Sequence, residues 1–300
     1  MITEITPAWA FNRYQEILER LPQPTRAGTS RPICDLRDVT DQFDVFVFDA
    51  FGVLNIGETP IDGAAARINE LRGHGKQIFL LSNSASQPSD DIRKKYAEMG
   101  YDFALSEVIT SRDVMIPDLR AYDSKMIWGV VAPPDTKCDD LPCHTVWLDA
   151  ENISNVDGII FLKISEWSDA QHQNLIHELA VRPMPVLIGN PDLVGPREDS
   201  FSRQPGFYGH DIWDHTGVVP AFFGKPYANA FELVRERLGS GVSEKRVLMV
   251  GDTLHTDILG AVAAGFSAAL VTQHGVLRGL DVAACIEASG IKPDLILPSI

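Results

Sequence analysis

Short runs of β-branched and other apolar residues recur along the outer parts of the chain, and amphipathic segments lie between many of them. The segments 63–75 and 226–239 each carry an apolar stripe with helical spacing, and the second stripe stops at Gly239. The strand-like runs lie at residues 45–49, 77–83, 107–110, 246–252, 268–273 and 295–298. This alternation of strands and helices predicts an α/β protein with a parallel sheet and helices on both faces.

The middle of the chain, residues 124–219, has an α/β pattern of its own. It contains a helix-like run at 169–181, and the stretch 192–211 shows little periodicity and is expected to be a loop. Its strand-like runs are MIWGVVA, HTVWL, GIIFLKI and PVLIG. We interpret 124–219 as a domain inserted into a core made of residues 1–123 and 220–300. Near the start of this core, a short helix is expected at 8–20.

The composition narrows the class of protein. Of the 300 residues 45% are hydrophobic and 22% are charged, and the net charge of −15 argues against nucleic acid as the main partner. No apolar stretch approaches the ~20 residues of a membrane span, and the N-terminus lacks a secretory signal pattern. Four scattered cysteines are expected to be reduced, and a cytoplasmic location fits these features.

Residues capable of chemistry stand where the expected strands end. Asp49 directly follows an apolar run, and Ser82, Thr110 and Asp252 occupy equivalent places after other runs. Ligands of open parallel sheets bind beyond the carboxyl ends of the strands, so these side chains are expected to meet at one edge of the sheet.

Lys225, between Gly224 and Pro226, stands just before a helix, where a cation opposes the helix dipole. That conflict favours a functional role for the lysine.

Four segments in order resemble the motifs of the haloacid dehalogenase superfamily of aspartate-nucleophile hydrolases. They are FDAFGV with Asp49, LLSN with Ser82 and Asn83, GKP with Lys225, and GDTLHTDI with Asp252 and Asp257, and the similarity covers about residues 44–274. The last motif and the run GNPDLVGP resemble class IIA, which includes sugar-phosphate and nitrophenyl-phosphate phosphatases. In that class an α/β cap separates the second and third motifs. The resemblance therefore implies a Rossmann-like core with 124–219 as the cap.

The resemblance also implies residue roles. Asp49 would attack phosphorus and form an aspartyl-phosphate, since a carboxylate is ionised at neutral pH without a base. Lys225 would offset charge on the transferred group, and Ser82 would donate a hydrogen bond to it. The remaining expected substrate contacts are Phe51, Gly52 with the amides of its turn, Asn83, Asn190 and Asp192.

A magnesium ion is expected between the acids. Mg²⁺ prefers oxygen ligands, and it would relieve the repulsion between converging carboxylates. Asp49, Asp252 and the backbone carbonyl of Phe51 are the implied ligands, with Asp257 holding a metal-bound water or Lys225.

Phe51 departs from the phosphatase pattern, in which a second aspartate stands two positions after the nucleophile and acts as general acid. Such acid–base help is worth ~10²–10⁴ in rate. Three explanations stay open. The leaving group departs unprotonated or takes its proton from another group, such as His255 or a cap residue; the protein is a 2-haloacid dehalogenase-like enzyme; or it binds a phosphorylated metabolite with little turnover.

The intact Gly251, Asp252 and Asp257 favour a Mg²⁺-dependent phosphatase, because displacing halide from carbon needs no metal. The expected substrate is a small phosphorylated metabolite, with no nucleic acid or membrane partner. Caps of this type often mediate dimers, so a homodimer is one expectation, although no sequence feature fixes the oligomeric state. A cluster in the cap is expected to be a solvated loop rather than a metal site; it consists of His210, Asp211, Asp214 and His215.

Overall fold

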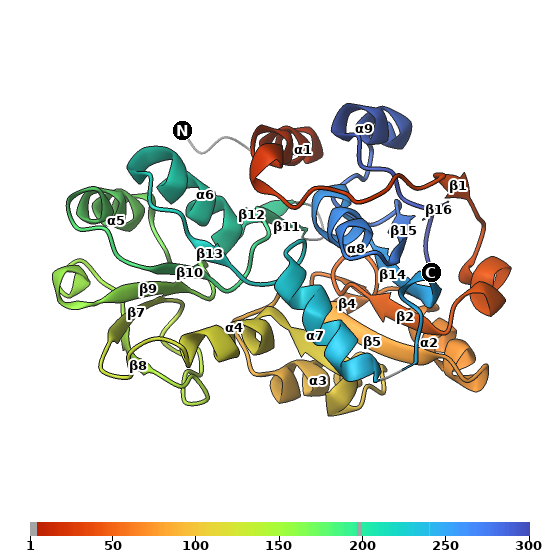
Figure 1. Ribbon diagram of the computed structural model, residues 1–300, viewed down its shortest axis with the longest axis horizontal. Coiled ribbons are helices and arrows are strands. Elements are labelled where there is room, and N and C mark those ends of the chain that lie inside the picture. Colours follow the sequence, from red (N-terminus) through yellow and green to blue (C-terminus); the bar gives the residue numbers. More distant parts are fainter. Residues whose placement is uncertain (1–4, 197–199, 240) are drawn as a thin grey trace.

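The computed structural model describes residues 5–196, 200–239 and 241–300, and it has two lobes, each built on a parallel sheet (Figure 1). The larger sheet has seven strands, all hydrogen-bonded in parallel. In spatial order they are β1 (Arg31–Pro32), β16 (Leu295–Leu297), β15 (Ser267–Val271), β14 (Val247–Gly251), β2 (Val45–Phe48), β5 (Gln77–Ser82) and β6 (Val108–Thr110). The prediction of an α/β parallel-sheet fold is confirmed.

Alternation along the strands divides the core into two layers. In β2, Val45 and Val47 belong to one apolar cluster and Phe46 and Phe48 to another, because successive side chains of a strand point to opposite faces. The valine side packs against α4 (Ser111–Leu119), α7 (Ala228–Leu238) and α8 (Leu259–Ala263). The phenylalanine side packs against α2 (Ala64–Gly73) and α3 (Ser89–Glu98). Both faces of the central strands are thereby buried, which explains their continuous apolar runs.

The second sheet has five parallel strands. Their order is β13 (Ala221–Phe222), β10 (Val186–Ile188), β9 (Gly158–Phe161), β7 (Ile127–Val131) and β8 (His144–Trp147). One face packs against α5 (Asp169–Val181) and α6 (Pro205–Thr216). The other face contributes Trp128, Val130 and Ile160 to the cluster shared with the larger lobe. This sheet extends to Phe222, three residues past the expected end of the insert.

The expectation of a loop at 192–211 is wrong for most of that stretch. It contains the hairpin β11 (Val194–Pro196) and β12 (Phe201–Arg203) and the start of α6, while residues 197–199 lie outside the described residues. The helical pattern was hidden because α6 buries glycine and histidine where aliphatic residues are usual. A Cβ at Gly209 would stand 2.7 Å from Ile188 Cγ1, so the close approach of α6 to the sheet requires this glycine.

The cluster on α6 is therefore not a solvated loop, and that expectation is also wrong. His210 is buried and stacks on Phe222 with ring centroids 4.6 Å apart. Asp211 Oδ2 accepts a 2.9 Å hydrogen bond from His172 Nε2. The two acids of the cluster are engaged in contacts that fix α6 in place, and within the described residues His210, Asp211, Asp214 and His215 are not brought together as a metal site.

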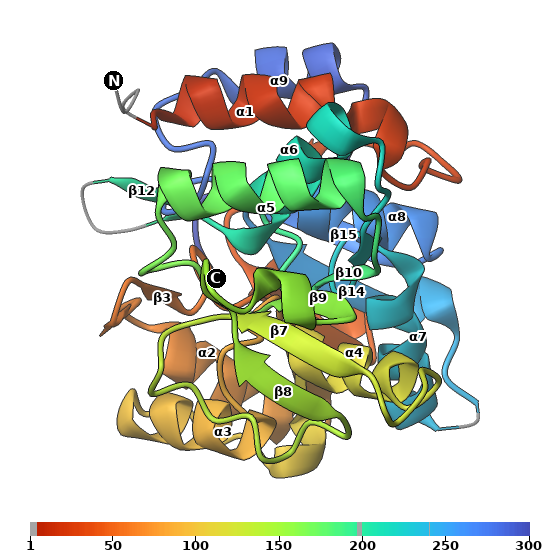
Figure 2. The same cartoon turned by 90° about the vertical axis from the view of Figure 1, so that its left-hand side faces the viewer.

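The N-terminal helix α1 (Pro7–Glu16) lies between the two lobes, with α6 on one side and α9 (Val282–Ser289) on the other (Figures 1 and 2). It ends earlier than the expected helix at 8–20, and a 3₁₀ turn at Leu18–Arg20 follows. The cysteines, all of which the structure describes, are free thiols, as expected. In the described ranges we find no helix with the length and apolar character that crossing a membrane requires. The remaining strands are β3 (Asn55–Ile56) and β4 (Thr59–Pro60), and the other 3₁₀ turns are Leu36–Gln42, Leu105–Glu107, Ile153–Asn155 and Glu244–Arg246.

Candidate active site

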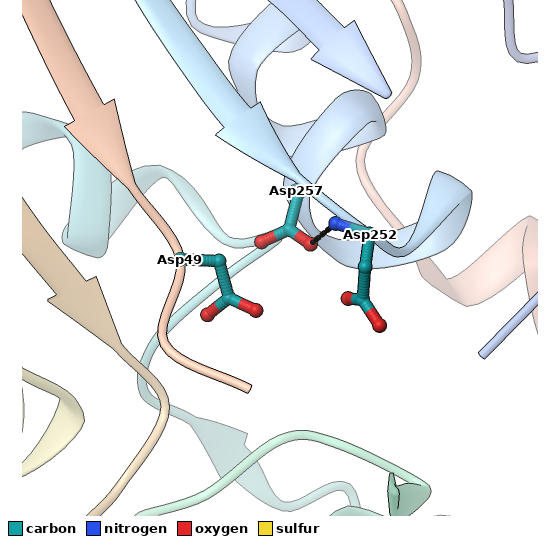
Figure 3. A group of neighbouring side chains, drawn as sticks. All are labelled: Asp49, Asp252 and Asp257. Carbon is teal, nitrogen blue, oxygen red and sulfur yellow. Dashed lines mark hydrogen bonds between the residues drawn. The ribbon is translucent and has the colours of Figure 1, made fainter. Parts of the chain in front are cut away.

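Three carboxylates meet at the carboxyl edge of the larger sheet. Asp49 follows β2, Asp252 follows β14, and Asp257 lies in a π-helical turn, Leu254–Ile258, that links β14 to α8. One oxygen atom from each lies within 4.8 Å of the others (Figure 3). The neighbouring pairing of β2 and β14 produces this meeting, because it aligns Phe48 with Val250 and so brings the residues after both strands together. Thr110 does not join them; its hydroxyl caps α4 by accepting from the Asp113 N–H.

Lys225 lies among these acids. Its ammonium donates to Oδ1 of Asp49 and lies 2.7 Å from Oδ1 of Asp257. The other oxygen of Asp257 accepts from the backbone N–H groups of Asp252 and Thr253, at 3.1 Å each. Burial alone would lower the pKa of Lys225, but the surrounding carboxylates of Asp257, Asp49 and Asp192 raise it above its ordinary value. The carboxylates around Lys225 therefore favour its charged form.

Asp252 is fixed by two hydrogen bonds and by a close glycine. Thr253 Oγ1 donates to one oxygen at 2.8 Å, and the Val276 N–H donates to the other at 3.0 Å. Gly52 adopts φ +80°, and a Cβ at this position would stand 2.5 Å from Asp252 Oδ2. The turn after Asp49 can therefore approach Asp252 only because residue 52 is glycine.

The charges of this cluster fit a divalent cation. Burial, and then the charge of Asp257, raise the pKa of Asp49 to about 7, although Lys225 acts in the opposite direction. Burial, followed by the charges of Asp49 and Asp257, raises the pKa of Asp252 well above its ordinary value. Asp257 Oδ1 is buried and, apart from its ion pair with Lys225, makes no hydrogen bond to any residue that the structure describes. One lysine does not balance three buried acids, and their donor atoms are the oxygens that Mg²⁺ prefers.

The cluster opens into a cavity of about 780 Å³ between the lobes, a size typical of small-molecule sites. Of the residues expected to form the site, Asp257 and Gly52 lie behind its wall rather than on it. The other eight line the cavity: Asp49, Phe51, Ser82, Asn83, Asn190, Asp192, Lys225 and Asp252. Residues of the insert that sequence reasoning did not single out also line it, among them Trp167, Arg203 and Tyr208.

Ser82 and Asn83, at the end of β5, differ in what they offer a ligand. The Oγ of Ser82 accepts the Ser84 N–H at 3.2 Å and keeps its own hydrogen for donation. The amide of Asn83 is engaged with the protein on both sides. Its Nδ2 donates to Asp192 Oδ1 at 2.7 Å and to the Lys225 carbonyl at 2.9 Å, and its Oδ1 accepts from the Lys225 N–H and Ser111 Oγ. Asn83 therefore joins Asp192 to Lys225.

Phe51 presents a ring where the phosphatase pattern has an acid. The ring is half-buried and lines the cavity. It packs against the apolar cluster on the face of the larger sheet that α2 and α3 cover. The ammonium of Lys95 lies 5.8 Å from its centroid. After it, the Gly52 N–H donates to the Asn55 carbonyl at 2.8 Å, which closes a turn ahead of the β3–β4 hairpin.

The surroundings of His255 do not favour it as the source of the missing proton, which is one of the alternatives that the sequence leaves open. The imidazole is 2% exposed, stacks on Tyr14 and does not line the cavity. Its Nε2 lies 2.8 Å from Oε1 of Gln15, so Nε2 carries the hydrogen, and burial lowers the pKa of His255 to about 3. Asp192, by contrast, lines the cavity, and burial raises its pKa to about 6.

Two family models match the two segments that carry the motifs. Residues 46–138 match one described as haloacid dehalogenase-like hydrolase, and residues 222–300 match a second, described as HAD-hydrolase-like. An acid sugar phosphatase from Staphylococcus aureus is 27% identical over 80% of this chain and 90% of its own length. A 4-nitrophenylphosphatase from Schizosaccharomyces pombe is 24% identical over 81% of this chain and 88% of its own.

Solved structures share the fold. One, described as a possible sugar phosphatase from Cytophaga hutchinsonii, superimposes with a TM-score of 0.77 at 23% identity, covering 90% of this chain and 98% of that one. A 4-nitrophenylphosphatase from Thermotoga maritima gives a TM-score of 0.68 at 22% identity, covering 86% and 95%. The order of the motifs, the site that they form and the two family models agree: the chain belongs to the haloacid dehalogenase superfamily of hydrolases, and it is similar to proteins named as sugar phosphatases and nitrophenylphosphatases.

Proposed function

We propose that this protein is a Mg²⁺-dependent phosphatase that hydrolyses a small phosphorylated metabolite through an aspartyl-phosphate on Asp49. One observation carries the proposal: Asp49 faces a cavity of small-molecule size, Lys225 donates to its carboxylate, and Asp252 and Asp257 lie close enough to it to share a cation. The named activities of the sugar phosphatase and nitrophenylphosphatase relatives support it. The insert 124–219 would act as the cap that selects the leaving group, since it supplies one wall of the cavity.

Each residue has a defined part in the reaction. The carboxylate of Asp49 attacks phosphorus, the P–O bond to the leaving group breaks, and water later attacks the phospho-aspartate to release phosphate. Lys225 offsets negative charge on the transferred group from a fixed position. The Ser82 hydroxyl donates to a phosphoryl oxygen. Asp257 holds the lysine and the Asp252 turn, and Asn83 holds Lys225 and Asp192 together.

Asp49, Asp252 and the carbonyl of Phe51 would hold Mg²⁺, with Asp257 behind them. The ion would neutralise charge on the phosphoryl oxygens and lower the repulsion between the two acids.

The ring of Phe51 restricts the choice of substrate. It cannot protonate a leaving alkoxide, so efficient substrates would be aryl or acyl phosphates, or esters whose leaving group reaches Asp192. The same ring supports a second candidate, a protein that binds phosphate esters but turns them over slowly. The dehalogenase alternative gains no support from a site that keeps Asp252 and Asp257. The cytoplasmic location and a homodimer remain predictions from the sequence.

Phosphate release from 4-nitrophenyl phosphate and from a panel of phosphorylated metabolites tests the proposal. Wild type and Asp49→Asn are compared with Mg²⁺ and with a chelator. We expect Mg²⁺-dependent turnover in wild type and none in Asp49→Asn. Binding of the same esters without turnover in either protein would favour the second candidate. Halide release from 2-haloacids that persists with chelator would contradict the phosphatase.

A further inference from the structure

The N-terminal helix α1 contacts both the core and the insert, and it contains none of the four family motifs. It precedes both matched segments, 46–138 and 222–300, so the family models assign nothing to it. In Figures 1 and 2 it lies over the junction of the two lobes, near the top of both views, and its contacts reach both lobes.

On the side of the insert, α1 and the turn after it bind α6. Arg13 Nη2 donates to Asp214 Oδ2 at 2.8 Å, and Arg20 Nη2 contacts the other oxygen of the same carboxylate at 2.5 Å. The rings of Trp9 and Phe207 lie 5.9 Å apart. These contacts attach the helix to the element that covers the second sheet.

On the side of the core, α1 binds the fourth motif and the C-terminal helix. Gln15 donates to the Ala288 carbonyl in α9 at 2.8 Å, and its Oε1 accepts from His255. The His255 ring is enclosed by Phe11, 5.4 Å away and edge-on, and by Tyr14, 5.0 Å away and stacked. His255 lies two residues before Asp257, so α1 is attached directly to the turn that carries the acid cluster.

Tyr14 is the point at which these attachments reach the cavity. Its side chain is 2% exposed, yet it lines the cavity together with Asp49 and Asp252. Its hydroxyl accepts the backbone N–H of Leu193 at 3.1 Å. Burial, and then the charge of Asp192, raise the pKa of Tyr14 well above its ordinary value, so the hydroxyl stays protonated.

Leu193 directly follows Asp192 in the chain. The hydrogen bond from the Leu193 N–H to the Tyr14 hydroxyl therefore fixes the turn that carries the Asp192 carboxylate. Other bonds also hold this turn: Asn83 Nδ2 donates to Asp192 Oδ1 at 2.7 Å, the Asp192 N–H donates to Asn190 Oδ1 at 2.9 Å, and the Gln204 N–H donates to the Leu193 carbonyl at 3.0 Å. Asn83 belongs to the core, whereas Asn190 and Gln204 belong to the insert. Tyr14 adds a support from a helix that is itself attached to both.

We propose that Tyr14 is a positioning residue of the active site, through which the N-terminal helix holds the Asp192 turn against the acid cluster. It acts on the leaving-group side of the reaction, where Asp192 lies, rather than on Asp49. This inference rests on the proposed function for its kinetic consequences, but the attachment itself is independent of catalysis.

Hydrogen exchange of the Leu193 amide, read by NMR in the full-length protein, tests the attachment. In Tyr14→Phe the ring still stacks on His255 but the amide loses its acceptor, so we expect exchange at least about tenfold faster. Tyr101→Phe is the matched control, since it also removes a buried tyrosine hydroxyl bonded to the backbone, at the Leu54 carbonyl. The control should leave Leu193 unchanged. Equal protection of Leu193 in wild type and Tyr14→Phe would overturn the proposal, whether or not the protein hydrolyses anything.

A double-mutant cycle with 4-nitrophenyl phosphate tests the consequence. We expect Tyr14→Phe to lower kcat/KM about fivefold, as the loss of one hydrogen bond would. If Tyr14 acts through Asp192, the same change made in Asp192→Asn should lower it less than about twofold. Tyr101→Phe should change kcat/KM by the same factor in both backgrounds. If Tyr14→Phe lowers kcat/KM by the same factor in wild type and in Asp192→Asn, Tyr14 does not act through Asp192, and its proposed positioning role is wrong. Absence of turnover in wild type would refute the proposed function instead, and the exchange experiment would still decide on Tyr14.

Discussion

Lys225 and Asp257 form an ion pair in which Nζ and Oδ1 are 2.7 Å apart and the side chains are 2% and 1% exposed. A buried pair of this kind adds little net stability, but removing one partner leaves a charge without compensation. The pair is better explained by position: Asp257 fixes the ammonium next to Asp49 while its other oxygen orders the backbone at Asp252.

Lys225→Met should therefore lower kcat/KM for 4-nitrophenyl phosphate by about 10²–10³, because it removes a fixed cation that acts on the developing charge. Lys245→Met is the control, since Lys245 is exposed on a 3₁₀ turn away from the cavity, and it should leave the rate unchanged. Steady-state kinetics of the two variants at saturating Mg²⁺ make the comparison. A Lys225→Met enzyme with the wild-type rate would refute the role of the lysine.

Gly52→Ala should weaken metal binding selectively. Residue 52 has φ +80° and a Cβ there would collide with Asp252 Oδ2, whereas Gly63, at φ +84°, has open space around the same position. Both substitutions carry the backbone cost of a left-handed residue, about 1 kcal/mol, but only the first displaces Asp252, which we propose as a metal ligand. Titration of each variant with Mn²⁺, followed by its electron paramagnetic resonance signal, separates the two effects. Equal Mn²⁺ affinity in both variants would contradict the placement of Asp252.

Phe51→Asp should raise turnover of esters with poor leaving groups. A carboxyl at this position could protonate an alkoxide, a contribution of ~10²–10⁴ in phosphatases that have it. Rates for an alkyl phosphate and for 4-nitrophenyl phosphate give the measurement, and we expect the alkyl ester to gain more. Phe51→Leu controls for loss of the ring. Loss of activity toward both substrates in Phe51→Asp alone would assign the ring a positive role.

His210 should make the fold sensitive to acid. Burial lowers the pKa of His210 to about 3, and its Nδ1 has no hydrogen-bond partner among the described residues. In the unfolded chain His210 has its ordinary pKa of about 6.5, so below that pH the unfolded state takes up a proton that the folded state does not. Protonation therefore favours unfolding. The folded state keeps its full free energy of unfolding above pH 6.5 and loses part of it as the pH falls toward 3. Between pH 7 and pH 5 wild type should lose about 2 kcal/mol more unfolding free energy than His210→Phe. Urea denaturation at the two pH values gives both numbers, and equal losses would show that His210 titrates normally.

The sequence was sufficient where chemistry is local to a strand end. Asp49 and Asp252 each follow an apolar run. Parallel strands end at the same edge of a sheet, so the pairing of β2 with β14 brings the two acids together. Asp257 was predictable as a partner of Lys225 because its motif places it one turn after Asp252.

Long-range packing was not predictable in the same way. The helix α6 was missed because its buried face uses glycine and histidine, and His255 was considered as an acid because nothing in GDTLHTDI reveals the rings of Phe11 and Tyr14 around it. Tyr14 itself carried no signal, since a tyrosine in a short N-terminal helix reaches the cavity only through the docking of α1 between the lobes. Such contacts join residues far apart in the chain and depend on the docking of whole elements.

The most direct test of the account is to trap the phospho-enzyme. Wild type is mixed with Mg²⁺ and 4-nitrophenyl phosphate, quenched in acid within one turnover and digested, and the peptide that contains Asp49 is examined by mass spectrometry. The account predicts the added mass of one phosphoryl group on Asp49, present in wild type and absent in Asp49→Asn and in the chelator control. Turnover without this adduct, or an adduct on any other residue, would contradict it.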